Sequence, residues 1–219
     1  MTEAAQAIQQ LTQAGSAFSA RGWLLGTSGN LSATLAFEPM RLVITSSGQD
    51  KGTLSAGSFV EVDADGRVLS GDGSPSAETS LHSVIVRRKK AGSVLHVHST
   101  WATVLSDLYA EQGGIAISGY EMLKGLSGVK THEHTEWLPI LENSQDYEKL
   151  SRDLDQLLLD HPQAHAVLLR GHGIYTWGAD VAEARRHVEI LEFLLEALGR
   201  AHLIRGTTAM SEGRKHGGR

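Results

Sequence analysis

The sequence predicts an α/β fold in which a central sheet is covered by helices on both faces. Segments with helical periodicity alternate along the chain with short apolar runs that are typical of buried strands. No internal repeat or long linker interrupts this alternation, and 219 residues are enough to bury one substantial core. We therefore expect a single domain over residues 1–205, followed over residues 206–219 by a polar, glycine-rich and flexible tail.

Each expected element follows from the spacing of its apolar residues. Apolar side chains recur at helical intervals from Ile8 to Phe18, which predicts a first helix with one buried face that ends near Arg21. The glycine-rich stretches 46–52 and 71–75 are expected loops. The expected strands are 30–37, 41–44, 58–63, 93–98, 115–118, 136–141 and 166–169. A second helix is expected to begin at 76–79, and three more are expected over 100–108, 145–160 and 181–198.

The composition narrows the possible functions. A formal charge of −5 without a basic block argues against a nucleic acid as the main partner. The chain has no cysteine, which excludes thiol chemistry and leaves His, Asp and Glu as the plausible metal ligands. No apolar run approaches the ~20 residues of a membrane span, and the N-terminus lacks the apolar core of a signal peptide. We expect a cytoplasmic protein that does not associate with membranes.

His96 and His98 stand two positions apart at the end of an otherwise apolar expected strand. Because side chains alternate along a strand, both imidazoles should lie on one face of the sheet, with Leu95 and Val97 on the other. Two imidazole nitrogens a few ångströms apart suit a borderline-soft divalent cation. The pair therefore indicates a metal site.

A third ligand has to come from another segment. His172 directly follows the expected strand 166–169 and has a glycine on each side, so the backbone can turn sharply and leave room around the imidazole. At the end of its own strand it could meet His96 and His98 across the sheet edge. Three histidine ligands would leave one coordination position open, which is typical of catalytic rather than structural zinc.

Other histidines compete for this role. His132 and His134 have the same two-residue spacing but lie in a polar stretch without a buried strand behind them, so they are the less favoured pair. His82 is expected to be a packed or hydrogen-bonded helix residue. The remaining histidines lack any paired context and are expected at the surface; they are His161, His165, His187 and His202.

Three loops of small residues could offer backbone N–H groups and hydroxyls to a phosphate. Each loop alone is a weak indication, but all three lie upstream of one histidine motif, which favours a common site. The candidate phosphate-binding residues are Ser28, Gly29 and Asn30 in the first loop, Ser46, Ser47 and Gly48 in the second, and Ser76 in the third.

Two carboxylates are candidates for proton transfer beside the metal ion. Glu78 opens the helix that follows Ser76, and Glu121 lies in the segment 119–125. A base beside a metal ion can remove a proton next to a carbonyl group that the metal polarises. The residues themselves do not rank the two glutamates.

Five motifs, in combination and order, make the chain resemble the class II aldolase family, whose members include fuculose-phosphate aldolase and ribulose-phosphate epimerase. The resemblance runs from the first helix to about Leu198. The motifs are Gly26-Thr27-Ser28-Gly29-Asn30-Leu31-Ser32, Ile44-Thr45-Ser46-Ser47-Gly48, Pro75-Ser76-Ala77-Glu78, His96-Val97-His98-Ser99 and Gly171-His172-Gly173.

The resemblance implies a three-layer α/β/α fold around a central mixed sheet and one zinc ion per subunit on His96, His98 and His172. It also implies a small phosphorylated ketose as substrate and a homotetramer with sites near the subunit interfaces. In the aldolases of the family the acid/base glutamate matches Glu78, and in the members that dehydrate a ketose phosphate the catalytic glutamate matches Glu121. The segments 120–126, 138–143 and 172–178 resemble those dehydrating members.

One departure from the family pattern concerns the phosphate. The aldolase motif has two serines before its glutamate, and Ala77 replaces the second, so backbone N–H groups or other side chains must compensate. We expect the dehydration reaction, with a sugar-phosphate aldolase that uses the same zinc site and Glu78 as the alternative. A non-catalytic adaptor is the least favoured hypothesis, because a binding module has no need of an open three-histidine site.

Overall fold

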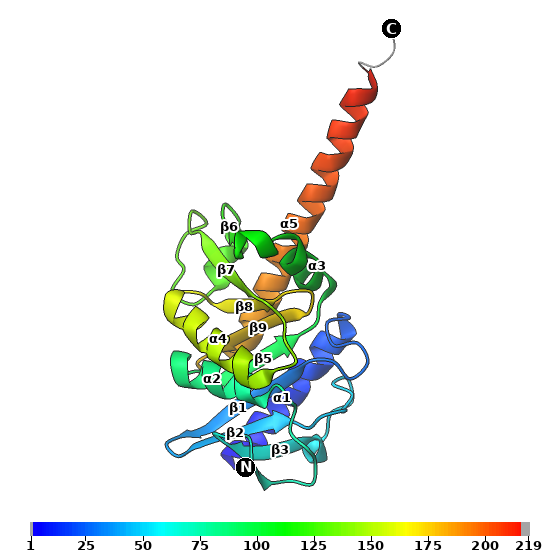
Figure 1. Cartoon of the computed structure of the whole chain (residues 1–219). Helices are drawn as coiled ribbons and strands as arrows, with labels where there is room; N and C mark the ends of the chain where they lie inside the picture. Colours follow the sequence, from blue (N-terminus) through cyan, green and yellow to red (C-terminus); the bar gives the residue numbers. More distant parts are fainter. Residues whose placement is uncertain (1, 216–219) are drawn as a thin grey trace.

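The computed structural model of the protein describes residues 2–215, with side chains up to Arg205. These residues form a nine-stranded sheet in the order β4-β3-β2-β1-β5-β9-β8-β7-β6, with five α-helices around it (Figure 1). The strands are β1 Asn30–Phe37, β2 Met40–Thr45, β3 Phe59–Asp63, β4 Val68–Ser70, β5 Ser93–Val97, β6 Gly114–Ile117, β7 Glu136–Leu141, β8 Ala166–Leu169 and β9 Gly173–Gly178. The helices are α1 Glu3–Ala20, α2 Thr79–Lys89, α3 Thr100–Leu108, α4 Tyr147–Asp160 and α5 Val181–Lys215, with the short 3-10 turns η1 Ala56–Ser58, η2 Ala110–Gln112 and η3 Glu121–Gly125.

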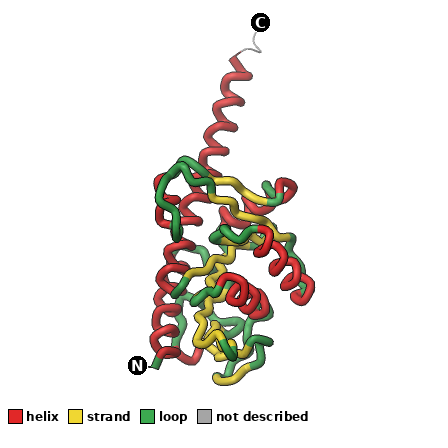
Figure 2. The backbone as a smooth tube through the Cα atoms, turned by 90° about the vertical axis from the view of Figure 1, so that its left-hand side faces the viewer, coloured by secondary structure: helices red, strands yellow, loops and turns green. Residues whose placement is uncertain are grey.

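Two hydrophobic cores lie on opposite faces of the sheet, so the fold has three layers (Figure 2). Helices α1, α3 and α5 cover one face, where Leu191 and Leu95 are fully buried. Helices α2 and α4 cover the other, where Ile85 and Leu154 pack over the side of β5 that carries Val94. The strands pair antiparallel except for β7 and β8, which are parallel. The expected α/β/α arrangement around a mixed sheet is confirmed.

Strand β5 lies between β1 and β9 and is antiparallel to both. His96 is in register with Asn30 on β1 and with Tyr175 on β9, so these side chains form a row across three strands. Leu95 and Val97 belong to the core under α1, α3 and α5. The period-two expectation therefore holds, and it places His96 on the face that α2 and α4 cover.

Two strands are absent from the sequence expectation. Glycine stands at both ends of β9, which favours turns in a sequence reading, although all six of its residues are buried. Strand β4 is an exposed edge strand of three residues, too short for an alternating pattern to show.

The last helix is longer than expected. Helix α5 does not end near Leu198 but continues to Lys215, and its final turns project beyond the sheet (Figure 1). The part of the expected tail at 206–215 is therefore helical, and 216–219 lie outside the described residues. Flexibility of the tail and the single domain over 1–205 stay predictions. Within the described part of the chain, no helix is both long and apolar enough to cross a membrane.

A tight turn between β8 and β9 places His172. Gly171 has φ +61°, in the left-handed region that glycine adopts without strain, and the His172 N–H donates to the Leu169 carbonyl at 3.1 Å. A Cβ on Gly173 would lie 2.2 Å from the carbonyl oxygen of Val97. The two glycines have different tasks, because the first turns the chain and the second lets β9 approach β5.

We expect Gly173→Ala to lower the free energy of unfolding by about 1–3 kcal/mol, because the new methyl group would have to push β9 away from the Val97 carbonyl. Urea denaturation measures the change. Gly57→Ala is the matched control, because a Cβ there meets open space, and it should cost less than about 1 kcal/mol. Equal losses in the two variants would show that the close approach of β9 to β5 is not a constraint.

Candidate functional site

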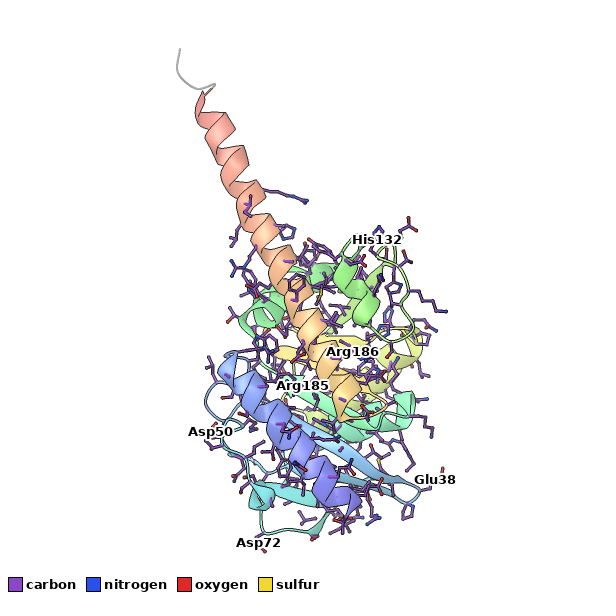
Figure 3. All side chains as sticks on the ribbon, turned by 180° about the vertical axis from the view of Figure 1, so that it is seen from behind. Glu38, Asp50, Asp72, His132, Arg185 and Arg186 are labelled. Carbon is purple, nitrogen blue, oxygen red and sulfur yellow. The ribbon has the colours of Figure 1, made fainter. Side chains whose placement is uncertain are left out.

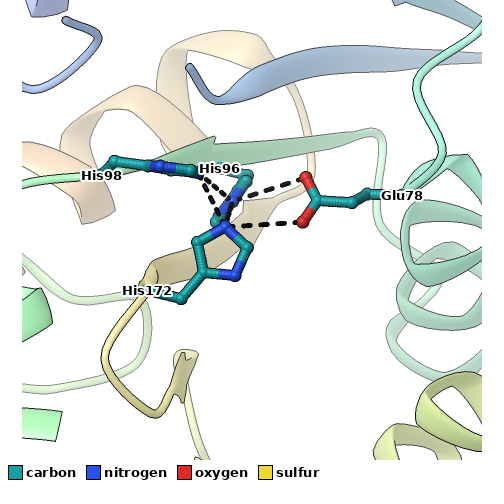
Figure 4. A group of neighbouring side chains, drawn as sticks. All are labelled: Glu78, His96, His98 and His172. Atoms are coloured by element: carbon teal, nitrogen blue, oxygen red, sulfur yellow. Dashed lines mark hydrogen bonds and ion pairs between the residues drawn. The ribbon is translucent and has the colours of Figure 1, made fainter. Parts of the chain in front are cut away.

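The end of β5 and the turn between β8 and β9 bring three imidazoles together (Figure 4). The Nε2 atoms of His96 and His98 are 2.8 Å apart, those of His98 and His172 are 2.9 Å apart, and those of His96 and His172 are 3.4 Å apart. Glu78, which immediately precedes α2, completes the group. Its carboxylate oxygens lie 3.6 Å from Nε2 of His96 and 3.5 Å from Nε2 of His172.

The surroundings keep these imidazoles neutral, which is the form that binds metal ions. Burial lowers the pKa of His96 well below its ordinary value, and the neighbouring His98 and His172 lower it further. Burial also lowers the pKa of His98 to about 4 and lowers the pKa of His172. Nδ1 of His96 donates to the carbonyl oxygen of Ile174 at 3.0 Å, which leaves the lone pair on Nε2, facing the other two rings.

The spacing of the three Nε2 atoms fits a divalent metal ion. Nitrogen ligands about 2.0–2.1 Å from a tetrahedral ion lie about 3.3 Å from one another, and the distances here are 2.8, 2.9 and 3.4 Å. One ligand atom from each of Glu78, His96, His98 and His172 falls within 4.8 Å of the others. In the tautomer that carries its proton on Nδ1, as the bond to Ile174 dictates for His96, each ring offers an Nε2 lone pair to a cation between them. The group is thus suited to a metal ion.

A chain of buried hydrogen bonds holds the Glu78 carboxylate. Nδ2 of Asn30 donates to Oε2 of Glu78 at 2.6 Å, and Oδ1 of Asn30 accepts from Nε2 of His82. Since an amide oxygen can only accept, His82 carries its proton on Nε2, and its Nδ1 accepts from the hydroxyl of Ser32 at 2.7 Å. Burial lowers the pKa of His82 to about 3, so the ring stays neutral and the direction of each bond is fixed. The expectation of a hydrogen-bonded His82 on a helix is confirmed.

His96 is also held from the side by Tyr175, its neighbour on β9. The two rings stack with their centroids 3.8 Å apart and their planes at 9°. Tyr175 is buried, and burial together with the charge of Glu78 raises the pKa of Tyr175 well above its ordinary value, so it stays a neutral phenol. Stacking and the bond to Ile174 therefore orient the His96 ring without help from a ligand.

A pocket of about 260 Å³ opens beside the histidine group. The hydroxyl oxygens of Ser28 and Ser46 are buried, and within the described residues neither has a hydrogen-bond partner. Buried polar atoms without a protein partner indicate where a polar ligand binds. All three predicted phosphate loops border the pocket, through Ser28, Gly29, Asn30, Ser46, Ser47, Gly48 and Ser76, together with Glu78, His98 and His172.

Two residues of the pocket, Lys51 and Tyr147, lie outside both the predicted site residues and the five family motifs. Lys51 follows the second phosphate loop, and only 2% of its surface is exposed. A lysine that closely follows a glycine-rich loop is a known sign of phosphate binding, so this signal could have found it. Tyr147 is the first residue of α4, and no local signal connects it with the pocket, because the packing of α4 beside α2 brings it there.

The structure does not bring Glu121 to this pocket within one chain. Glu121 begins η3 with 72% of its side chain exposed, and its carboxylate lies 2.7 Å from Nζ of Lys124 and 3.7 Å from Nδ1 of His132. The hydrogen bond from Lys124 is the main cause that lowers the pKa of Glu121. Within one chain, Glu121 is therefore not part of the histidine group.

The other histidine pair stays apart from the group. Figure 3 shows His132 at the upper right of the globular body, at the opposite end from Asp72. Nε2 of His134 is 2.9 Å from a carboxylate oxygen of Glu136. The expectation of a surface position is wrong for His187, which is only 2% exposed. Its two ring nitrogens bond to backbone atoms of β9 and of Ser127, and these bonds satisfy the imidazole inside the protein.

The model for the family described as Class II Aldolase and Adducin N-terminal domain matches residues 9–198. The chain belongs to this family. It is 46% identical to the methylthioribulose-1-phosphate dehydratase of Sorangium cellulosum over 178 aligned residues. The alignment spans 80% of this chain and 83% of that protein. Over 202 residues it is 43% identical to the protein of the same name from Methylococcus capsulatus, with 92% and 97% covered. The expected family membership is confirmed.

Solved structures agree with this assignment. The crystal structure of YgbL from Escherichia coli matches with a TM-score of 0.74 and 28% identity over 90% of this chain and 89% of that one. L-fuculose-1-phosphate aldolase from Thermus thermophilus matches with a TM-score of 0.74 and 24% identity over 93% and 98% of the two chains. The second likeness concerns the fold alone.

We expect His98→Ala to weaken the binding of a divalent metal ion by more than about 100-fold, because it removes one of three converging nitrogens. Its ring is only partly buried, so the fold should survive, which circular dichroism checks. Elemental analysis after dialysis measures the metal. His134→Ala is the matched control with the same sequence spacing and should keep one ion per chain; the opposite pattern would place the metal elsewhere.

Proposed function

We propose that the protein is a hydro-lyase that dehydrates 5-methylthioribulose 1-phosphate to 2,3-diketo-5-methylthiopentyl 1-phosphate, a step of methionine salvage. The observation that carries the proposal is the pocket, where a group suited to a metal ion, a carboxylate and three phosphate loops meet. Relatives that are 46% and 43% identical and named methylthioribulose-1-phosphate dehydratase support the choice of substrate.

We propose zinc, one per subunit, as the metal ion. Three neutral imidazoles in a chain without cysteine form the donor set of catalytic zinc sites that keep an open position. When bound, such an ion supplies Lewis-acid stabilisation of negative charge that develops on the oxygens of the substrate. His96, His98 and His172 would hold it, and the stacking of Tyr175 on His96 keeps the geometry rigid.

The reaction needs a base that takes the proton from the carbon next to the ketone and an acid that protonates the departing hydroxyl. We assign the base to Glu121, which matches the catalytic glutamate of the dehydrating members of the family. We assign the acid to Glu78, whose carboxyl group borders the pocket and lies beside the histidine group. The hydroxyl leaves as water, and the remaining enol takes up a proton on carbon to become the second ketone.

The role of Glu121 requires contact between copies of the chain. We propose a homotetramer in which Glu121 of one copy faces the histidine group of another. The high exposure of Glu121 and of its neighbour Met122, which is 40% exposed, supports a position at such an interface. Each site would then be complete only in the assembly.

Incubation of the zinc-loaded protein with methylthioribulose 1-phosphate should give the diketone, with loss of one water, because the proposed chemistry breaks a C–O bond. Mass spectrometry and 13C NMR identify the product, and His98→Ala serves as the inactive control. The aldolase alternative breaks a C–C bond with the same metal site and Glu78. An aldehyde and a three-carbon phosphate without diketone would establish that alternative.

We expect Glu121→Gln and Glu78→Gln each to lower kcat by about 10²- to 10⁴-fold, because each removes a proton carrier. Mixing Glu121→Gln subunits with His98→Ala subunits should restore part of the activity, since some sites then combine intact groups from two chains. Near-normal turnover by Glu121→Gln alone would move the base to Glu78. Mixtures that stay inactive although subunits exchange would contradict the role of Glu121 across subunits.

A further inference from the structure

The phosphate of the proposed substrate would bind close to a carboxylate. A phosphate monoester carries a charge of about −1.5 to −2 at pH 7, and Glu78 borders the same pocket. Ala77 offers no hydroxyl where the aldolase motif has a serine. Loop N–H groups compensate only in part, since those of Ser28 and Ser47 already donate to backbone carbonyls at 3.2 and 2.8 Å. The pocket needs a further donor with a positive charge.

Lys51 lies where the first two phosphate loops meet; its neighbour Asp50 marks this part of the chain in Figure 3. Nζ of Lys51 donates to the carbonyl oxygen of Thr27 at 2.6 Å and to that of Gln49 at 2.9 Å. An ammonium group has three N–H donors. Among the residues that the structure describes, the third has no partner, so it is left for a ligand.

Lys51 is also the one cationic side chain among the described residues that border the pocket. Burial is the larger influence on Lys51 and lowers its pKa, whereas the charges of Asp50 and Glu78 raise that pKa. The charge of Lys51 in turn contributes to the lowered pKa of His98. The two partners that hold Nζ are neutral carbonyls rather than a carboxylate, so the buried positive charge has no bonded counter-ion.

We propose that Lys51 binds the phosphate group of the substrate and makes the pocket select a phosphorylated sugar over the same sugar without phosphate. This inference rests on the proposed function and adds the residue that recognises the charged end of the substrate. The third N–H of Lys51 donates to a phosphate oxygen, stands in for the hydroxyl missing at Ala77, and offsets the repulsion from Glu78. Its other two bonds keep both phosphate loops in place around the ligand.

Titration with inorganic phosphate isolates this interaction from catalysis. We expect the dissociation constant measured by calorimetry on zinc-loaded protein to rise about 10- to 100-fold in Lys51→Met. Lys149→Met removes the same charge from an exposed position on α4 and should bind phosphate as the wild type does. Equal affinity in Lys51→Met and wild type, or no phosphate binding by the wild type, would overturn the proposal.

A purely structural role for Lys51 predicts equal losses for charged and neutral ligands. We expect KM to rise about 10- to 100-fold for methylthioribulose 1-phosphate in Lys51→Met, and to change less than about threefold for methylthioribulose without phosphate. Equal changes for the two sugars would contradict a role in recognising phosphate.

The absence of cysteine from the chain allows the charge to be rebuilt chemically. Lys51→Cys can be alkylated specifically with 2-bromoethylamine, which recreates an ammonium of nearly the same length, whereas iodoacetamide adds a neutral group of similar size. We expect only the aminoethylated protein to regain phosphate affinity, to within about tenfold of wild type. Folded aminoethylated protein that does not regain affinity would refute the role of the charge.

The phosphate titration and the product assay separate this inference from the proposed function. A wild type that binds phosphate through Lys51 but does not form the diketone refutes the dehydration and leaves the phosphate role of Lys51 standing. If the wild type forms the diketone and Lys51→Met keeps its phosphate affinity, the dehydration stands and the phosphate role of Lys51 is refuted.

Discussion

The mutual approach of three neutral imidazoles is the constraint on which the site depends. The Nε2 atoms of His96, His98 and His172 lie 2.8–3.4 Å from one another, close enough for one cation to share all three nitrogens. The sheet enforces it by placing one ligand within β5, one just after it, and the third in the tight turn before β9. Stacking on Tyr175 then prevents the His96 ring from turning away. Helix α2 begins beside the three histidines, and Glu78 immediately precedes its first residue, so the Glu78 carboxylate joins the group.

Hydrogen bonds of Asn30 connect the first phosphate loop to the histidine group. It is the last residue of the first phosphate loop and the first of β1, so its backbone belongs to the phosphate end of the pocket. Its side chain donates to Glu78 and accepts from His82, a buried residue of α2. A ligand that orders the loop therefore also orders the carboxylate. Through this link, binding of the phosphate end of a substrate could help to orient the carboxylate beside the reacting carbons.

Much of the site can be predicted from the sequence where the pattern is local. The alternation of Leu95, His96 and Val97 predicts that His96 lies on one face of a strand and the two apolar residues on the other. In the structure, Leu95 and Val97 are in the hydrophobic core. Contacts between distant segments cannot be predicted this way: His82 meets Ser32 across 50 positions only because α2 packs on β1. For Glu121 the limit is of another kind, since the sequence of one chain does not say which surface an exposed carboxylate will meet.

The distances along the chain between the ligands also determine when the centre can form. His96 and His172 are 76 positions apart, and Asn30 and Glu78 are 48 apart. Small zinc modules, whose ligands are close in sequence, use the ion to start folding. Here β1, β5 and β9 must already be paired before three nitrogens converge, and such long-range pairings form slowly. A metal ion that binds this group would therefore be taken up late in the maturation of the chain, after most of the polypeptide has left the ribosome.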